Sequence, residues 1–205
     1  MNILVTGAAG FVGKNLVASL RNLRDGKDLT RPSLQIDQIF EYDINTDPSL
    51  LDEFCRDADF VFNLAGVNRP KDQTEFMAGN FSFASTLLDT LKKHGNKASV
   101  MLSSSIQATL IGRYADSEYG KSKLAGEKLF FDYANECGTR VLVYRFPNLF
   151  GKWCHPNYNS VVATFCHNIA NDLPIQVNDP LVELELLYIC LLYTSKRCVP
   201  ALRRF

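Results

Sequence analysis

A glycine-rich stretch near the N-terminus constrains the fold more than any other part of the chain. The apolar run Ile3-Leu4-Val5 leads into Gly7, Gly10 and Gly13, and an amphipathic segment follows. The run has the length and branching of a buried parallel strand, and the next segment has helical periodicity. A strand, three spaced glycines and a helix are typical of a turn that binds a dinucleotide pyrophosphate, although a glycine-rich turn without a ligand is the alternative.

Each glycine is expected to do something that a side chain would prevent. Gly7 permits the tight turn, Gly10 lets a pyrophosphate approach the backbone, and Gly13 lets the helix pack closely on the strand. The N-terminus of the helix then offers N–H groups and its dipole to the phosphates. The cofactor-binding residues expected in this turn are Gly7, Gly10, Phe11, Val12 and Gly13.

The remaining chain alternates short apolar runs with amphipathic segments. We expect further strands at residues 38–44, 60–64, 100–102 and 140–146, and helices at 14–23, 47–56, 80–93, 116–135 and 160–171. The fourth helix is expected to start near Tyr119 and to stop at Gly138. This alternation predicts an α/β protein with a Rossmann-like, doubly wound parallel sheet and helices on both faces.

Composition narrows the functional classes. The chain has 205 residues, a formal net charge of zero and 46% hydrophobic residues, which predicts one domain with an ordinary core. Nothing in the charge balance favours a nucleic-acid partner, and no apolar run is long enough for a membrane span. A core strand at the N-terminus leaves no room for a signal peptide, and six cysteines without paired spacing suggest free thiols, so we expect a cytoplasmic protein.

The ends of the second and third strands are expected to meet the cofactor. An acid at the end of the second strand favours the ribose hydroxyls of NAD, whereas a nearby arginine favours the phosphate of NADP. Asp43 is the acid, but it could also lie beside the adenine, and Arg31 in the preceding loop could reach a phosphate, so both cofactors stay open. The residues expected to contact the cofactor here are Asp43, Ile44, Leu64, Ala65 and Gly66.

Three residues form a candidate catalytic group. Tyr119 and Lys123 are four residues apart, so a helix places them on one face, and Ser105 follows a strand. An ammonium beside a phenol should lower the phenol pKa and let Tyr119 exchange a proton with a substrate oxygen. A solvated helix face is the alternative for such a pair, and it is the interpretation given to Glu127 and Lys128 further along.

Several longer motifs carry a family resemblance. The turn GAAGFVG, the segments NLAG and SSS, YGKSK, and RFPNLFG resemble the extended short-chain dehydrogenase/reductases. LAGVNRP, SSSIQAT, RFPNLFGKWC and PNYNSVVATFC more narrowly resemble the nucleotide-sugar reductases of capsular polysaccharide synthesis, the CapF type, over residues 1–188. The resemblance implies reduction of the keto group of a UDP-linked 6-deoxy-acetamido-hexose, with NADPH as cofactor and NADH possible.

The resemblance also implies roles for individual residues. Tyr119 would donate the proton, Lys123 would tune it and hold the nicotinamide ribose, and Ser105 would orient the substrate carbonyl. Asn80 and Pro147 would join the cofactor site. The residues expected to contact the UDP-sugar are Gln107, Asn148, Asn157, Asn159 and Ser160. A homodimer through the helices at 80–93 and 119–135 is a further expectation.

The C-terminal segment departs from the family pattern. Residues 1–189 are expected to form the NAD(P)-binding domain with a truncated C-terminal substrate lobe, and residues 190–205 a tail of foreign origin. The spacing of Cys154-His155 and Cys166-His167 fits no compact zinc site, so no metal is expected. Two alternatives to the reductase stay open: a nucleotide-sugar epimerase or dehydratase, and an inactive nucleotide-binding Rossmann protein.

Overall fold

A five-stranded parallel sheet forms the centre of the chain. The computed structural model describes residues 1–66, 81–158 and 160–192, and within them the strand order is β2-β1-β3-β4-β5. The five strands are β1 (Asn2–Thr6), β2 (Gln38–Tyr42), β3 (Phe60–Asn63), β4 (Ser99–Ser105) and β5 (Val141–Phe146). The described helices are α1 (Phe11–Arg24), α2 (Leu50–Asp57), α4 (Phe83–Lys93), α5 (Glu118–Cys137), α6 (Val161–Ala170) and α7 (Ile189–Leu192), with short 3-10 turns η2 (Ile106–Thr109) and η3 (Gly112–Tyr114). The predicted Rossmann-like α/β fold is confirmed.

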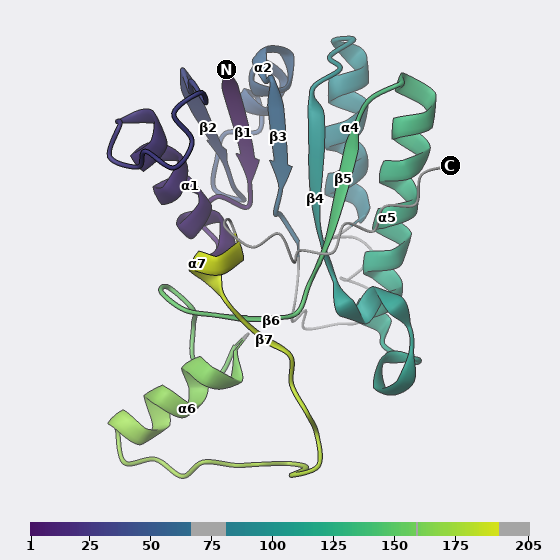
Figure 1. Cartoon of the computed structure of the whole chain (residues 1–205). Helices are drawn as coiled ribbons and strands as arrows, with labels where there is room; N and C mark the ends of the chain where they lie inside the picture. Colours follow the sequence, from purple (N-terminus) through teal and green to yellow (C-terminus); the bar gives the residue numbers. More distant parts are fainter. Residues whose placement is uncertain (67–80, 159, 193–205) are drawn as a thin grey trace.

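Helices pack on both faces of this sheet, as Figure 1 shows. On one face, α2, α4 and α5 cover a core in which Leu87, Leu91, Val100 and Phe130 are fully buried. On the other face, α1 packs on β1 through a second apolar cluster. Burial of about 25 cal/mol per Å² of apolar surface stabilises both layers. The apolar stripe predicted at residues 83–91 therefore lies in the core.

The sheet has a switch point beside β1. The chain passes from β1 through α1 to β2 on one side, and then crosses to β3 on the other side of β1. At such a point the connections leave the carboxyl ends of the two strands in opposite directions, and ligands of open α/β sheets bind in the crevice that results. The glycine-rich turn follows β1 and residues 64–66 follow β3, so both lie at this crevice.

Several predicted boundaries were wrong, and local hydrogen bonds explain three of them. Strand β2 ends at Tyr42, because Asp43 turns back and its carboxylate accepts the Ala9 N–H. Helix α2 begins at Leu50 instead of residue 47, because the Asp47 carboxylate accepts hydrogen bonds from the N–H and hydroxyl of Ser49 and forms a turn. Strand β4 continues through Ser105, since residues 100–105 all pair with β5.

Two further boundaries also differ from the prediction. Helix α1 begins at Phe11, so that Gly13 lies inside its first turn, and β3 ends at Asn63. The long helix α5 runs from Glu118 to the left-handed Gly138, in line with the predicted stop. Residue 80, where the next helix was predicted to start, lies outside the described residues.

The segment after β5 forms a small lobe below the carboxyl ends of the strands in Figure 1. Strands β6 (Asn148–Phe150) and β7 (Leu186–Tyr188) pair in parallel, and α6 stands between them in the sequence. Ser160 caps α6, which confirms a helix close to the predicted 160–171, yet α6 has no buried residue. The predicted division at residue 189 stays a prediction: residues 189–192 form α7, and 193–205 lie outside the described part.

Within residues 1–66, 81–158 and 160–192, no helix is both long and apolar enough to cross a membrane.

Candidate functional site

The glycine-rich turn is packed so tightly that two of its glycines accept no side chain. Gly7 has a φ of +69°, and a Cβ there would lie 2.7 Å from the nitrogen of Ala65, which follows β3. A Cβ on Gly13 would lie 2.1 Å from the carbonyl oxygen of Gly7. The turn and the close packing predicted for these two residues are therefore present. The contact of Gly10 with a pyrophosphate stays a prediction.

The first turn of α1, which faces the glycine-rich turn, contains no acidic side chain. It includes Phe11 and Val12, and the N-cap residue, Gly10, provides no side-chain cap. Behind the turn, the buried Thr6 hydroxyl donates to the Asn63 side chain at 2.6 Å, which ties β1 to β3. This arrangement fits a pyrophosphate, because a helix N-terminus favours negative charge and a tight backbone lets it approach.

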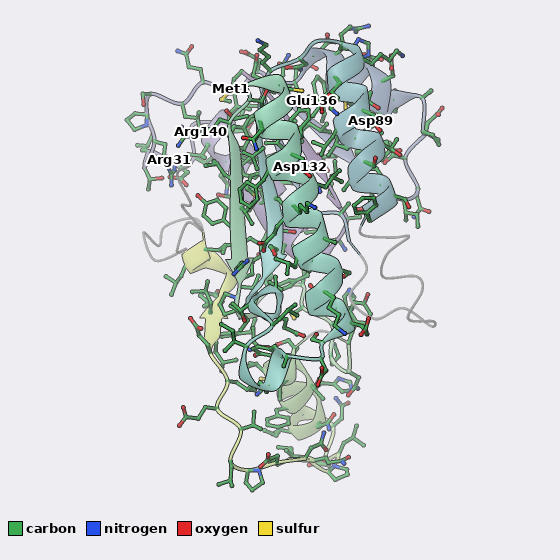
Figure 2. The ribbon with its side chains drawn as sticks, turned by 90° about the vertical axis from the view of Figure 1, so that its right-hand side faces the viewer. Met1, Arg31, Asp89, Asp132, Glu136 and Arg140 are labelled. Atoms are coloured by element: carbon green, nitrogen blue, oxygen red, sulfur yellow. The ribbon has the colours of Figure 1, made fainter. Side chains whose placement is uncertain are left out.

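Asp43 lies directly beside the same turn. Its carboxylate accepts hydrogen bonds of 2.8 Å from the N–H groups of Ala9 and Ile44. The Ile44 side chain is 92% exposed, and Arg31 lies in the loop between α1 and β2 (Figure 2). A carboxylate at the end of β2 is where a dinucleotide-binding fold meets the adenosine ribose. Leu64 and Ala65 lie across the turn, after β3.

Ser105, Tyr119 and Lys123 come together at the carboxyl end of β4. Ser105 ends the strand, and its side chain is hydrogen-bonded to the Tyr119 side chain. The Lys123 Nζ lies 5.6 Å from the centre of the Tyr119 ring and donates to the Ser103 carbonyl at 3.2 Å. The sequence predicted this juxtaposition. The residues therefore offer a phenol, a hydroxyl and an ammonium group to one small volume.

The predicted direction of the Tyr119 pKa was wrong. Burial raises the pKa of Tyr119 to about 12, and the hydrogen bond from Ser105 lowers it only in part. Burial also lowers the pKa of Lys123 to about 8, against the opposing effect of the Glu127 carboxylate. Desolvation outweighs the attraction between the Lys123 ammonium and a Tyr119 phenolate on which the prediction was based. Both groups lose water when α5 packs on β4. Near pH 7, Tyr119 is a phenol that can donate its proton.

The residues predicted to bind the substrate divide into two groups. Gln107 lies beside the candidate catalytic residues: its N–H donates to the Ser105 hydroxyl at 3.2 Å and its side-chain oxygen accepts from Ser117 at 2.8 Å. Pro147 follows Phe146, which pairs with Ser105. In the lobe, Asn148 bonds to the Glu185 carbonyl, the Asn157 N–H donates to Thr164, and Ser160 caps α6. Asn80, Asn159 and part of the predicted dimer helix lie outside the described residues.

One buried polar cluster was missed by the sequence analysis. Glu127 was interpreted as part of a solvated face, but it is 2% exposed and accepts two hydrogen bonds from Arg145. Its position four residues after Lys123 was the signal that could have shown it, because i, i+4 and i+8 share one helix face. Lys128, next to it, is exposed as predicted.

The lobe contains an open hollow of about 530 Å³ between α6 and the loop after β6. Its lining is mostly apolar and includes Phe150, Pro156, Val162 and His167. Cys154 and Cys166 also line it, and neither forms a disulfide. No group of three or more potential metal ligands occurs among the residues that the structure describes.

The fold and the tight turn define a nucleotide-binding protein of the Rossmann-like α/β class, with a tyrosine–lysine pair at the strand ends. The sequence matches the NAD dependent epimerase/dehydratase family over residues 3–189, and the chain belongs to this family. The predicted family resemblance is therefore confirmed.

The chain is also similar to individual proteins of known name or structure. The chain is 42% identical over 189 residues to UDP-2-acetamido-2,6-beta-L-arabino-hexul-4-ose reductase of Pseudomonas aeruginosa, covering 92% of this chain and 46% of that protein. The crystal structure of the capsular polysaccharide assembling protein CapF from Staphylococcus aureus superposes with a TM-score of 0.76 at 46% identity, covering 95% of this chain and 47% of that one. UDP-glucose 4-epimerase from Thermotoga maritima has the same TM-score at 20% identity, which shows the shared fold. The chain thus spans about half the length of the first two relatives.

Proposed function

We propose that this chain carries the catalytic half of a cytoplasmic NAD(P)H-dependent reductase of a UDP-linked keto-6-deoxy-acetamido-hexose, used for surface polysaccharide precursors. The observation that carries the proposal is the contact of Ser105 with Tyr119 beside Lys123, at the edge of the sheet that also holds the glycine-rich turn. The 42% identity to a reductase of such a sugar supports reduction over epimerisation or dehydration.

The proposed chemistry follows from the protonation states of the site. A bound reduced nicotinamide supplies hydride to the keto carbon. Tyr119 keeps its proton at neutral pH, because burial raises its pKa, and it can therefore give that proton to the oxygen that becomes an alcohol. The Ser105 hydroxyl can hydrogen-bond the same oxygen and hold it in line with Tyr119. Lys123 can donate to the nicotinamide ribose and supply positive charge beside the phenol.

Two features bear on the choice between NADPH and NADH, and they favour different cofactors. The resemblance to the capsular reductases favours NADPH, whereas the Asp43 carboxylate beside the turn favours the ribose hydroxyls of NADH. Calorimetric titration of the 205-residue chain with NADPH and with NADH decides between them. Binding of either one supports the proposed cofactor site, and binding of neither would contradict it.

Turnover tests the reaction itself. The chain is mixed with reduced cofactor and UDP-2-acetamido-2,6-β-L-arabino-hexul-4-ose, and loss of the reduced nicotinamide absorbance is followed together with the mass of the sugar product. A product two hydrogens heavier is expected. A product of unchanged mass with cofactor retained through purification would support the epimerase alternative. A chain that binds cofactor but transforms no nucleotide sugar would support the inactive nucleotide-binding protein.

The assembly is part of the same proposal. The resemblance to the extended short-chain reductases implies pairing through two helices of each subunit, and α4 and α5 lie side by side in the present chain, joined by Lys92 and Glu136. We expect a homodimer through these helices. Sedimentation that gives a monomer mass at all concentrations would contradict it.

A further inference from the structure

The three serines at the end of β4 each bond to a different residue of one face of α5. Ser105 contacts Tyr119 through its side chain, the Ser103 carbonyl accepts from Lys123, and the Ser104 hydroxyl donates to Glu127. Tyr119, Lys123 and Glu127 are four residues apart, so they stand one above another along the helix. Each of the three serines at the end of β4 therefore has its own partner on one face of α5. Glu127 is one of these partners, beside the candidate catalytic residues Tyr119 and Lys123.

Glu127 is also paired with a charge from the next strand. Arg145 of β5 donates from Nε to Glu127 at 2.8 Å and from Nη2 at 2.6 Å, so the carboxylate is held by both of its oxygens. Arg145 is the strand partner of Ser104, which places Glu127 over the β4–β5 pair. The Glu127 side chain is 3% exposed and that of Arg145 is 29% exposed. A buried carboxylate held in this way is a fixed negative charge.

The Glu127 carboxylate affects the protonation of Lys123, together with the other titratable groups of the elements packed there. From α5 the groups are Tyr119 and Glu127, from β5 the group is Arg145, and β4 contributes only the uncharged serines. Burial disfavours the Lys123 ammonium, and Glu127 is the group that opposes this effect. Arg145 balances part of the Glu127 charge and orients it. Burial and the Glu127 carboxylate therefore act on the Lys123 ammonium in opposite directions.

We propose that Glu127 is a positioning residue, whose carboxylate, held in place by Arg145, keeps the Lys123 ammonium charged beside Tyr119. The inference rests on the proposed function in one respect, because the role of Lys123 toward cofactor and phenol belongs to that proposal. The effect of Glu127 on the charge of Lys123 involves only residues of this chain. It is therefore measured without cofactor or substrate.

The experiment is a pH titration of the lysine side chains of the whole chain by NMR, with ¹³C-labelled lysine and Lys123→Met to assign the Lys123 signal. Glu127→Gln keeps the shape and the bond from Ser104 but removes the charge, so the midpoint of Lys123 should fall by about one pH unit. Arg145→Gln leaves Glu127 without its partner, so the midpoint should rise. The matched control is Asp132→Asn, an exposed acid on the same helix (Figure 2), which should leave the midpoint unchanged.

The two variants protect the test against a folding failure, because their expected shifts have opposite signs. Circular dichroism first establishes that each variant is folded, and either folded variant is sufficient. A midpoint unchanged from wild type, or shifted equally by Asp132→Asn, would overturn the inference.

The failure of the proposed function gives a different pattern. If the Lys123 midpoint shifts as expected while the wild-type chain reduces no UDP-keto-sugar, the positioning role stands and the proposed reaction is wrong. If the wild-type chain reduces the sugar but the midpoint does not move in either variant, the reaction stands and the positioning role is wrong.

Discussion

The Asp43 carboxylate accepts a hydrogen bond of 2.8 Å from the N–H of Ala9, which joins the end of β2 to the middle of the glycine-rich turn. Its other oxygen accepts from the N–H of Ile44. The negative charge is thus fixed beside the place where the fold binds an adenosine ribose. This position makes Asp43 the residue that should decide how well a 2′-phosphate is accepted.

Asp43→Asn should therefore move the cofactor preference toward NADPH. The amide keeps an oxygen for the Ala9 N–H but no longer repels a phosphate, and a tenfold change in the ratio of the two dissociation constants, about 1.4 kcal/mol, is expected. Calorimetry with both cofactors measures it. Asp37→Asn is the control, because Asp37 lies before β2 and pairs with the N-terminus. An unchanged ratio in Asp43→Asn would show that the ribose lies elsewhere.

Gly13→Ala should disrupt the turn. The new methyl group would lie 2.1 Å from the Gly7 carbonyl oxygen, so the helix must move away from the turn. We expect a loss of about 2–3 kcal/mol in the free energy of unfolding, in the range of other overpacked sites, and at least a tenfold weaker cofactor affinity. Urea denaturation and calorimetry measure the two effects.

Gly126→Ala is the matched control for that prediction. Gly126 also lies in a helix, but a Cβ there would meet no heavy atom within 4 Å. Removing a glycine from a helix interior should stabilise the chain by about 0.5–1 kcal/mol. If both substitutions destabilise the chain equally, the close contact at Gly13 is not the cause.

Tyr119→Phe should remove the proton donor while keeping the packing. Turnover should fall by about 10²–10⁴-fold, and cofactor affinity should stay within about twofold. The variant should also lose a pH dependence of its stability. Burial raises the Tyr119 pKa from 10.0 to about 12, so between these pH values the folded wild-type chain binds one proton more than the unfolded chain. Its stability should fall by about 1.4 kcal/mol per pH unit there, a slope that Tyr119→Phe would lack.

Much of the fold could be predicted because local signals and tertiary packing agree. The apolar run before Gly7 forms β1, and the apolar stripe from Phe83 to Leu91 forms the buried face of α4. Gly138 ends α5, as the sequence predicts. Boundaries failed where a side chain competes with the backbone. Asp43 and Asp47 end or delay an element by hydrogen bonds of their own, and such local competition leaves no trace in hydrophobic periodicity.

The candidate site shows the same division. Spacing alone placed Tyr119 and Lys123 on one helix face, and the strand end brought Ser105 to them. Spacing could not predict how deeply they would be buried, so the direction of the Tyr119 pKa was wrong. The spacing from Lys123 could have placed Glu127 on the buried face, but its partner Arg145 lies on β5, distant in sequence, and spacing does not predict that ion pair.

Lys123→Met should make the chain more stable at neutral pH and less able to bind cofactor. Burial lowers the Lys123 pKa from 10.5 to about 8, so below pH 8 the folded chain holds an unfavourable charge worth on the order of 3 kcal/mol. Between pH 8 and 10.5 the unfolded chain binds the extra proton, and the stability that this group costs is regained as pH rises. Methionine removes this cost but leaves the Ser103 carbonyl without the Lys123 donor, a loss of about 1 kcal/mol, so a net gain of about 2 kcal/mol is expected at pH 7. Chemical denaturation of both proteins at pH 7 and pH 10 measures it, and the difference between them should shrink at the higher pH. A variant less stable than wild type at pH 7 would show that the Lys123 ammonium supports the fold instead of costing stability for the sake of the site.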